Sequence, residues 1–143
     1  MDIRQFEHLP QDILEGIQVV HRHVFDGDSL KEEKLHNKKG FLAFVAIEDG
    51  KVIGFKLGYE MEDGVFYSWL GGVHPSFQKR GIASQLMVAQ HEECAKRGYP
   101  KVRTYGRNAK KAMLILNIKH GFDIIDTFID KKGRHKIIFE KEL

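Results

Sequence analysis

The stretch Val73-His74-Pro75-Ser76-Phe77-Gln78-Lys79-Arg80-Gly81-Ile82-Ala83 joins a segment typical of a β-strand to a segment with helical periodicity. Unpaired N–H groups and the positive end of the helix dipole make the start of a helix an anion-binding position. Gly81 and the small Ala83 let the backbone approach a ligand closely, while Lys79 and Arg80 add positive charge. The residues favour a phosphate-bearing ligand at this corner, with an ordinary strand-to-helix loop as the alternative.

The chain before this stretch is typical of an antiparallel sheet. Residues 41–48, 51–60 and 65–74 are rich in β-branched and aromatic side chains, and turn signals separate them. Asp49-Gly50 is a two-residue hairpin signal. We therefore predict a three-stranded meander. Gly71-Gly72, inside the third strand, indicates a bulge or the close approach of a ligand, with fraying as the alternative.

Helical periodicity occurs in four segments. After Pro10 the apolar residues through Val24 fall on one face, and Ser29 with Glu32 has capping-box spacing that predicts a second, short helix ending at Gly40. We also predict helices over 83–94 and 109–120, and strands over 101–105, 122–130 and 135–140. Cys94 is interpreted as a small buried hydrophobe. Core-facing positions on the last helix are predicted for Met113, Leu114, Leu116 and Ile118.

Composition limits the classes of protein that fit. A chain of 143 residues with 42% hydrophobic and 30% charged residues is expected to form one globular domain, residues 1–143. The longest apolar run, residues 41–47, is far shorter than the about 20 residues of a membrane-spanning helix, so we expect no membrane partner. A single cysteine rules out an internal disulfide and fits a cytoplasmic location.

Two further classes of ligand are not expected. Net charge is +3, but the basic residues are spread along the chain with no aromatic RNA-binding motif, so nucleic acid is not predicted. His21, His23, Asp26 and Asp28 superficially resemble a metal cluster. Histidines two residues apart diverge on a helix, so we interpret this group as a solvated helix end and predict no metal site.

Other phosphate-binding loops do not match residues 73–83. The stretch lacks the additional glycines of a dinucleotide fingerprint and the Gly-Lys-Ser/Thr of an NTPase loop. Residues 78–83 instead resemble the Gln/Arg-x-x-Gly-x-Gly/Ala signature of the GNAT superfamily of acyl-CoA-dependent N-acyltransferases. Val73-x-Pro75 before it, Gln85-Leu86-Met87 after it, and Asn108…Met113…Asn117-x-x-x-Gly121-Phe122 strengthen the resemblance, and the order of elements matches over nearly the whole chain.

The resemblance implies a fold and a ligand. The fold is an α/β domain with one mixed, mostly antiparallel sheet, helices on both faces and splayed central strands. The wedge between those strands holds the pantetheine arm of acetyl-CoA, and the Val73 main chain pairs with the arm or polarises the thioester carbonyl. Asn108 and Asn117 flank the arm from the other side, and Gly71-Gly72 stands where the family has a bulge. The amides that carry the diphosphate are those of Gln78, Lys79, Arg80, Gly81, Ile82, Ala83 and Ser84.

The implied reaction is attack of a neutral amine on the thioester, so a proton must leave the amine and the departing thiolate accepts one. Many family members carry a tyrosine acid where this chain has Asn117, and a carboxylate on the central strand, of which residues 65–78 have none. Tyr105 is the candidate acid; His74, acting through water, and Glu60 are candidate bases. Each has an alternative: Tyr105 as wedge packing, His74 as a surface loop residue, and Glu60 as a solvated strand end.

The acceptor is expected to be the amine of a small molecule or a protein. His23, Phe25, Tyr59 and Trp69 are predicted to bound its pocket, because aromatic surface suits a cation. Exposed strand edges favour a homodimer. The missing tyrosine and carboxylate suggest an alternative function: an acyl-CoA-binding sensor with a GNAT fold and little turnover.

Overall fold

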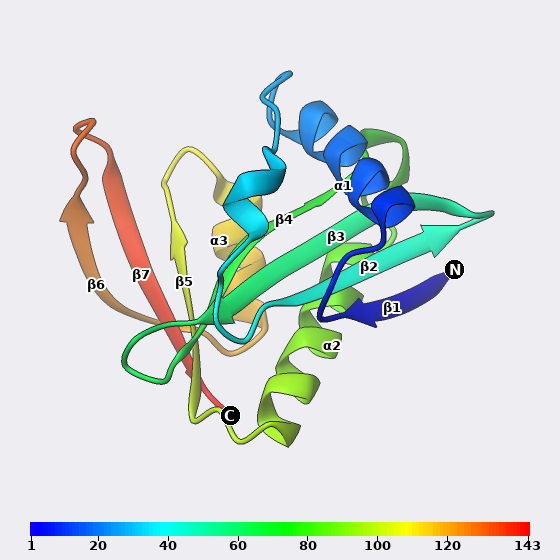
Figure 1. Ribbon diagram of the computed structural model, residues 1–143. Helices are drawn as coiled ribbons and strands as arrows, with labels where there is room; N and C mark the ends of the chain where they lie inside the picture. Colours follow the sequence, from blue (N-terminus) through cyan, green and yellow to red (C-terminus); the bar gives the residue numbers. More distant parts are fainter.

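A computed structural model describes all 143 residues and shows one seven-stranded sheet in the order β1-β2-β3-β4-β5-β7-β6 (Figure 1). Every neighbouring pair is antiparallel except β4 and β5, which are parallel. The mixed, mostly antiparallel sheet predicted from the sequence is thereby confirmed. The strands are β1 (Asp2–Phe6), β2 (Leu42–Glu48), β3 (Lys51–Glu60), β4 (Phe66–Val73), β5 (Lys101–Gly106), β6 (Asp123–Ile129) and β7 (His135–Glu142).

Helices cover both faces of the sheet (Figure 1). Side chains of successive strand residues point to opposite faces, so β2 contributes to two cores. Ala43 and Val45 pack with α1 (Gln11–Val24), and Leu42 and Phe44 pack with α2 (Ile82–Lys96). The short helix α3 (Lys111–Lys119) lies on the α2 face, where Leu114 contacts the core.

Two elements differ from the prediction. Strand β1 pairs with β2 along the sheet edge, yet the sequence order was expected to begin with a helix. Only Ile3 and Phe6 of β1 are partly buried, so the segment carries too little apolar alternation to show in the sequence. The predicted helix from Ser29 to Gly40 is a single 3₁₀ turn, η1 (Glu32–Leu35). Asn37 and Gly40 have φ of 60° and 65°, which no helix can accommodate.

The central strands are splayed, as expected from the resemblance. Strands β4 and β5 pair only at Phe66 with Val102 and at Tyr67 with Arg103. One further link follows, a 2.9 Å hydrogen bond from Thr104 Oγ1 to the Ser68 carbonyl oxygen. Beyond Ser68, β4 keeps its pairing with β3 on one side and has no strand partner on the other. The sheet therefore opens into a wedge toward the end of β4 that precedes α2.

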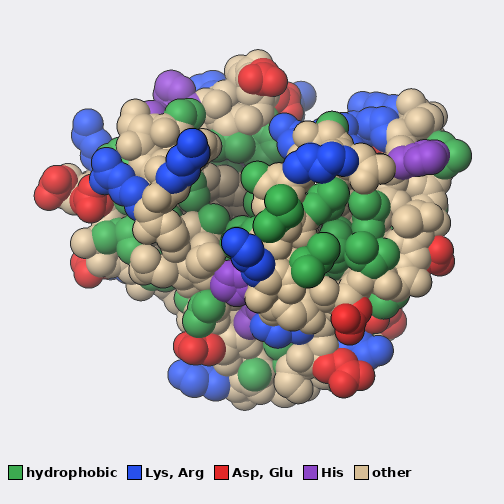
Figure 2. Space-filling view, turned by 180° about the vertical axis from the view of Figure 1, so that it is seen from behind, with side chains coloured by type: hydrophobic (Ala, Val, Ile, Leu, Met, Phe, Trp, Pro, Cys, Tyr) green, Lys and Arg blue, Asp and Glu red, His purple; other side chains and the backbone are tan.

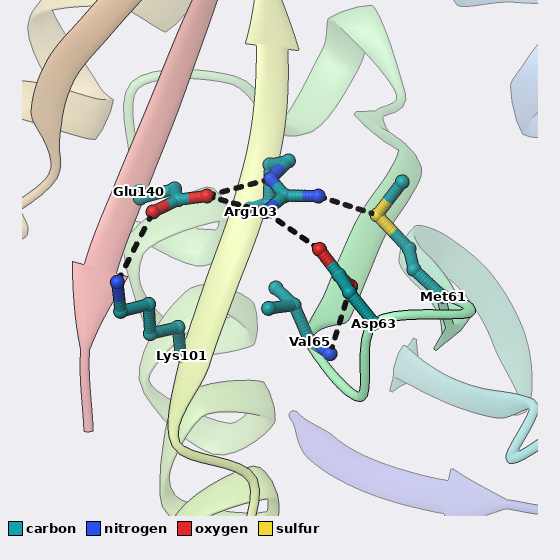
Figure 3. A network of polar contacts seen from close by, with 6 residues as sticks. All are labelled: Met61, Asp63, Val65, Lys101, Arg103 and Glu140. Atoms are coloured by element: carbon teal, nitrogen blue, oxygen red, sulfur yellow. Dashed lines mark hydrogen bonds and ion pairs between the residues drawn. The ribbon is translucent and has the colours of Figure 1, made fainter.

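A polar network closes the narrow end of this wedge (Figure 3). The Arg103 guanidinium on β5 bonds the Glu140 carboxylate on β7, at 2.7 Å through Nε, and the Asp63 carboxylate at 3.0 Å. Asp63 also accepts a 3.2 Å hydrogen bond from the Val65 N–H at the entry to β4. Lys101 adds a 3.6 Å contact to Glu140. The network ties the turn before β4 to β5 and β7, so the two splayed strands share a fixed origin.

The bulge in β4 does not lie at Gly71-Gly72, where we expected it. Register runs from Leu57–Leu70 to Gly58–Ser68, which leaves Trp69 as the extra residue, and Gly71 and Gly72 pair regularly with β3. A Cβ at Gly72 would lie 3.0 Å from Val24, so this glycine allows the close approach of α1. The bulge places both Trp69 and Leu70 against the α1-side core, because the extra residue interrupts alternation.

The C-terminal part of the molecule exposes apolar side chains. Met113 and Ile118 on α3 are 40% and 55% exposed, contrary to the prediction that they face the core, because only the Leu114–Leu116 side of this short helix packs on the sheet. Every residue of the edge strand β6 is exposed. Figure 2 shows the molecule from behind, with hydrophobic side chains gathered on the half that carries α3 and β6. The homodimer expected from exposed strand edges stays a prediction.

None of the helices combines the length and the apolar character that crossing a membrane requires.

Candidate functional site

The loop before α2 presents a row of unpaired backbone donors. The N–H groups from Gln78 to Ser84 donate to no backbone carbonyl, and the first helical hydrogen bond runs from the Gln85 N–H to the Gly81 carbonyl, at 3.1 Å. Lys79 and Gly81 have φ of 64° and 77°, which turns successive N–H groups toward one side of the loop. With the positive end of the α2 dipole, this loop can bind a phosphate group.

Side chains of the loop hold its position. The Gln78 amide donates a 3.1 Å hydrogen bond to the Val73 carbonyl, which ties the loop to the end of β4. The Arg80 guanidinium lies 5.1 Å from the centre of the Phe77 ring. Ser84 Oγ lies 3.0 Å from His120 Nε2 at the end of α3, so this contact joins the two helices that border the wedge.

The free edge of β4 offers backbone groups to the wedge. The His74 N–H bonds the Ile53 carbonyl of β3 at 2.8 Å. Main-chain groups alternate between the two sides of a strand, so those of Val73 and Gly71 point away from β3 and into the wedge. Gln78 occupies the Val73 carbonyl, which leaves the Val73 N–H as the donor available to a ligand.

The two asparagines are placed differently by the structure. Asn117 is 3% exposed, and its backbone carbonyl accepts bonds from His120 and Phe122 at the end of α3. Asn108 is exposed in the turn between β5 and α3. Asn117 therefore belongs to the inner surface of α3. Asn108 is exposed just beyond the end of β5 that lies at the open side of the wedge.

A row of aromatic rings crosses the α1 face of the sheet. Ring centres lie 5.6 Å apart for Tyr59 and Trp69, 5.3 Å for Tyr59 and Tyr67, and 5.3 Å for Tyr67 and Tyr105. Phe128 on β6 continues the row at 6.0 Å from Tyr105. Burial, followed by the neighbouring tyrosines, raises the pKa of Tyr67. We call these five residues the aromatic row; it begins near the bulge of β4 and reaches β6.

The predicted acceptor pocket is only partly assembled. Tyr59 and Trp69 are in contact, but the His23 ring meets His74 edge to face with ring centres 4.5 Å apart, and the Phe25 ring centre lies 4.4 Å from that of His21. Sequence reasoning missed Tyr67, Tyr105 and Phe128 as members of the same surface. Alternate spacing joins Tyr67 to Trp69 within one strand, but only sheet order brings β5 and β6 beside them.

The two candidate bases lie in different surroundings. His74 Nδ1 accepts a 3.1 Å bond from the Ser76 N–H and so caps the turn η2 (Pro75–Phe77) beside the loop. The Glu60 carboxylate lies 2.9 Å from Lys39 Nζ and accepts a 3.1 Å bond from the Tyr99 hydroxyl. These bonds, the Lys39 bond first, hold the pKa of Glu60 below its usual range. Glu60 pairs with Phe66, at the closed end of the wedge, and is not gathered with Tyr105.

A group of basic side chains on the α2 face was not predicted. Lys56 on β3 is 9% exposed and takes part in no hydrogen bond or ion pair, and its Nζ lies 3.7 Å from where a Cβ of Gly71 would be. Burial lowers the pKa of Lys56 to about 8. Burial, then the charges of Lys141 and Lys56, lowers the pKa of His91 to about 3, and Lys141 Nζ is 3.1 Å from His91 Nδ1. The sequence signal that could have identified this group is Lys56, a lysine within the otherwise mostly apolar strand β3.

A cavity of about 640 Å³ lies elsewhere, between the start of α1 and residues 36–41. It contains no residue of the α2 loop, and Lys38 is the residue that it shares with the surroundings of the aromatic row. Nowhere do three or more His, Cys, Asp or Glu side chains gather as metal ligands would.

Comparison with known proteins agrees with this geometry. The family model for the acetyltransferase (GNAT) domain matches residues 39–124. An acetyltransferase of Sodalis glossinidius is 28% identical over 134 residues, which cover 90% of this chain and 92% of the relative.

Two solved structures share the fold at lower identity. An aminoglycoside 6'-N-acetyltransferase complexed with coenzyme A has a TM-score of 0.82 at 15% identity, covering 99% of this chain and 97% of that chain. The ribosomal-protein-S18-alanine N-acetyltransferase from Escherichia coli has a TM-score of 0.80 at 19% identity, covering 99% and 94%.

Proposed function

Because the chain belongs to the GNAT acetyltransferase family, whose members are acyltransferases, we propose that it moves an acetyl group from acetyl-CoA to a primary amine of a small molecule or a protein. The observation that carries the proposal is the row of unpaired N–H groups from Gln78 to Ser84 beside the unpaired edge of β4. The first feature fits a diphosphate, and the second fits an extended arm that bears amides.

The residues assigned to acetyl-CoA follow from this arrangement. The amides of residues 78–84 bind the diphosphate, and Lys79 and Arg80 add charge at the exposed rim. The Val73 N–H pairs with the pantetheine arm along β4, and Asn117 faces the arm from α3, with Asn108 at the entrance. His120, through its contact with Ser84, holds α3 against the start of α2. Acetyl-CoA supplies an activated acyl group, and these residues orient it.

Proton transfer is assigned to groups near the splay. Tyr105 lies in the aromatic row on β5, close to where the strands separate, and we propose that its hydroxyl donates a proton to the departing thiolate. His74, beside the loop, is the proposed acceptor of the amine proton through water, after its Nδ1 has released the Ser76 N–H. Glu60 is the weaker candidate, because its carboxylate is engaged by Lys39 and Tyr99 at the closed end. Holding the amine and thioester together supplies much of the rate.

The acceptors named for the structural relatives do not identify the acceptor of this chain. Two proteins of the same fold act on a ribosomal protein and on an aminoglycoside according to their names, so the fold supports acceptors of different sizes. The acceptor must be argued from this chain's own surface.

Isothermal titration with acetyl-CoA tests the proposal, with dephospho-CoA and NADH as controls. Micromolar binding of acetyl-CoA and no binding of NADH support the proposed site, and release of CoA thiol on addition of amines then supports transfer. Absence of binding at millimolar acetyl-CoA overturns the proposal. Binding without thiol release from a broad amine panel would favour the sensor alternative.

A further inference from the structure

We propose that the Tyr59–Trp69 end of the aromatic row binds the acceptor as an alkylammonium ion, in a position that Lys38 occupies when no acceptor is bound. The inference rests on the proposed function and deepens it, because it names the acceptor as a monoamine with an apolar body. The seat is defined by Tyr59 and Trp69, and we call it the cation seat.

The structure itself shows an ammonium in the cation seat. Lys38 Nζ lies 4.8 Å from the centre of the Tyr59 ring and 5.4 Å from that of Trp69. The two rings meet edge to face, at 76°, so they present two differently oriented π surfaces to one cation. Both distances are within the about 6 Å at which a cation is attracted to an aromatic face. The chemistry that this seat accepts is therefore a primary ammonium on an alkyl chain.

Lys38 is held there weakly. Its ammonium makes no ion pair and no hydrogen bond, whereas the adjacent Lys39 pairs with Glu60 at 2.9 Å. Lys38 lies in the irregular segment between η1 and β2, so no helix or strand fixes its backbone. Cation–π contacts at exposed positions are individually modest, so a competing alkylammonium can displace this side chain. Lys38 acts as a tethered competitor for the seat.

The cation seat lies on a path to the wedge. Tyr59 contacts Tyr67, and Tyr67 contacts Tyr105, with ring centres 5.3 Å apart at each step. Trp69 is the extra residue of the β4 bulge, which is why its ring joins Tyr59 on the α1 face. An amine docked at the seat therefore reaches the splay along an aromatic surface. Transfer follows after the ammonium loses its proton through water to His74, since only the neutral amine carries the lone pair that attacks.

The charges around the row favour a monoamine. No carboxylate forms an ion pair with the Lys38 ammonium in the seat, and Lys39 neutralises the carboxylate of Glu60, which follows Tyr59 in the chain. A polycationic acceptor requires several free carboxylates, because each ammonium must be paired as it leaves water. Rings without free carboxylates instead favour one charge joined to an alkyl or aryl body.

Trp69 is the only tryptophan of the chain, so its fluorescence reports directly on the seat. We would titrate the full chain, without acetyl-CoA, with n-butylamine hydrochloride at pH 7, using sodium chloride and n-butanol as controls for ionic strength and for the alkyl group. We expect a saturable change with butylammonium alone. Lys38→Ala should bind it about two- to fivefold more tightly, since the competitor is gone. Lys34→Ala, at an exposed position of η1 without an ion pair, is the matched control and should bind as the unaltered protein does.

Several outcomes would overturn the inference. No saturable change in the unaltered protein and in Lys38→Ala would do so, as would equal effects of Lys38→Ala and Lys34→Ala. A response to spermidine alone would overturn the monoamine class. Tyr59→Leu should abolish the response while its circular dichroism stays unchanged; if that spectrum changes, Tyr59→Phe, which keeps the ring, should retain binding.

The result separates from that of the proposed function. Calorimetry with acetyl-CoA on the same protein reads the α2 loop, not the cation seat. Binding of acetyl-CoA without a fluorescence response to butylammonium would contradict only the cation-seat proposal. A fluorescence response to butylammonium without acetyl-CoA binding would contradict the proposed acetyl transfer and would support only an ammonium-binding surface.

Discussion

The Thr104 hydroxyl donates a 2.9 Å hydrogen bond to the Ser68 carbonyl, and this bond is the last link between β4 and β5 before they separate. Backbone pairing covers only two residue pairs, so a side chain marks the point where the wedge begins. The opening is therefore sensitive to one hydroxyl group. The Arg103 network supports the same strands from the closed end (Figure 3).

Thr104→Val should loosen the wedge. The exchange keeps the shape of the side chain but leaves the Ser68 carbonyl, on a residue 3% exposed, without its donor. We expect a loss of about 1–2 kcal/mol in the free energy of unfolding. Urea denaturation measures the loss, and calorimetry should show weaker acetyl-CoA binding. Thr104→Ser restores the donor and should recover most of both; equal losses in the two variants would contradict the role of the hydroxyl.

Gly81→Glu should abolish acetyl-CoA binding without unfolding the protein, because a carboxylate would enter the proposed diphosphate site. Any side chain at φ of 77° carries backbone strain, so Gly81→Gln is the matched control, equal in size and uncharged. Both variants should lose similar stability, about 1 kcal/mol. Calorimetry should show much weaker binding in Gly81→Glu than in Gly81→Gln. Unchanged affinity in Gly81→Glu would count against the loop.

Tyr105→Phe should lower turnover and leave acetyl-CoA affinity unchanged, because it removes a hydroxyl but keeps the ring in the aromatic row. General acid catalysis contributes about 10²–10⁴-fold, which bounds the expected loss. Steady-state thiol release with a responsive amine measures it. Tyr67→Phe is the matched control on the neighbouring ring, 5.3 Å away, and should retain activity. Full activity in Tyr105→Phe would mean that Tyr105 packs in the wedge and donates no proton.

Lys56→Met should stabilise the protein near pH 7. Burial lowers the pKa of Lys56 from 10.5 to about 8, so below pH 8 the folded state bears the cost of a desolvated charge. Between pH 8 and 10.5 the unfolded chain binds more protons than the folded one, so the free energy of unfolding of the unaltered protein rises with pH. We expect Lys56→Met to gain up to about 3 kcal/mol at pH 7.

That gain should shrink as pH rises from 8 to 10.5, because the folded state then holds Lys56 neutral and removing its proton costs less as the pH approaches 10.5. Urea denaturation at pH 7 and pH 10 measures the difference. Lys51→Met, at the exposed start of the same strand, is the control and should change stability little at either pH. A Lys56→Met variant that is less stable than the unaltered protein at pH 7 would contradict the argument.

Gly58→Ala should be strongly destabilising. A Cβ at Gly58 would lie close to both the Phe66 ring and the Tyr67 carbonyl oxygen, and the backbone atom cannot move aside. Gly71→Ala is a milder comparison, since its nearest atom would be 3.3 Å away. We expect a loss of about 2–4 kcal/mol in Gly58→Ala and a smaller one in Gly71→Ala. Thermal denaturation of the two variants would rank them; equal losses would contradict the packing argument.

Much of the architecture was predictable from local signals. Period-two and helical patterns, with turn residues at 49–50 and 61–64, predicted six of the seven strands and the three α-helices. The loop at 78–84 was recognisable because glycine and cations at a strand-to-helix corner have a local physical meaning. Strand β1 was missed because an edge strand with two partly buried residues has almost no pattern of its own. Helical periodicity predicted α3 itself but not its buried face, because the sequence of a short apolar helix does not reveal which of its apolar side chains pack on the sheet.

The sequence by itself determined the order of the α-helices and of strands β2 to β7, and the position of the loop before α2, because hydrophobic periodicity, glycine conformations and helix ends are properties of neighbouring residues. Tertiary structure alone decided the rest. The bulge at Trp69 is a matter of register between β3 and β4, the aromatic row needs β3, β4, β5 and β6 in one sheet, and Lys38 meets Tyr59 and Trp69 across a loop. Such long-range contacts depend on strand pairing, which no single segment encodes.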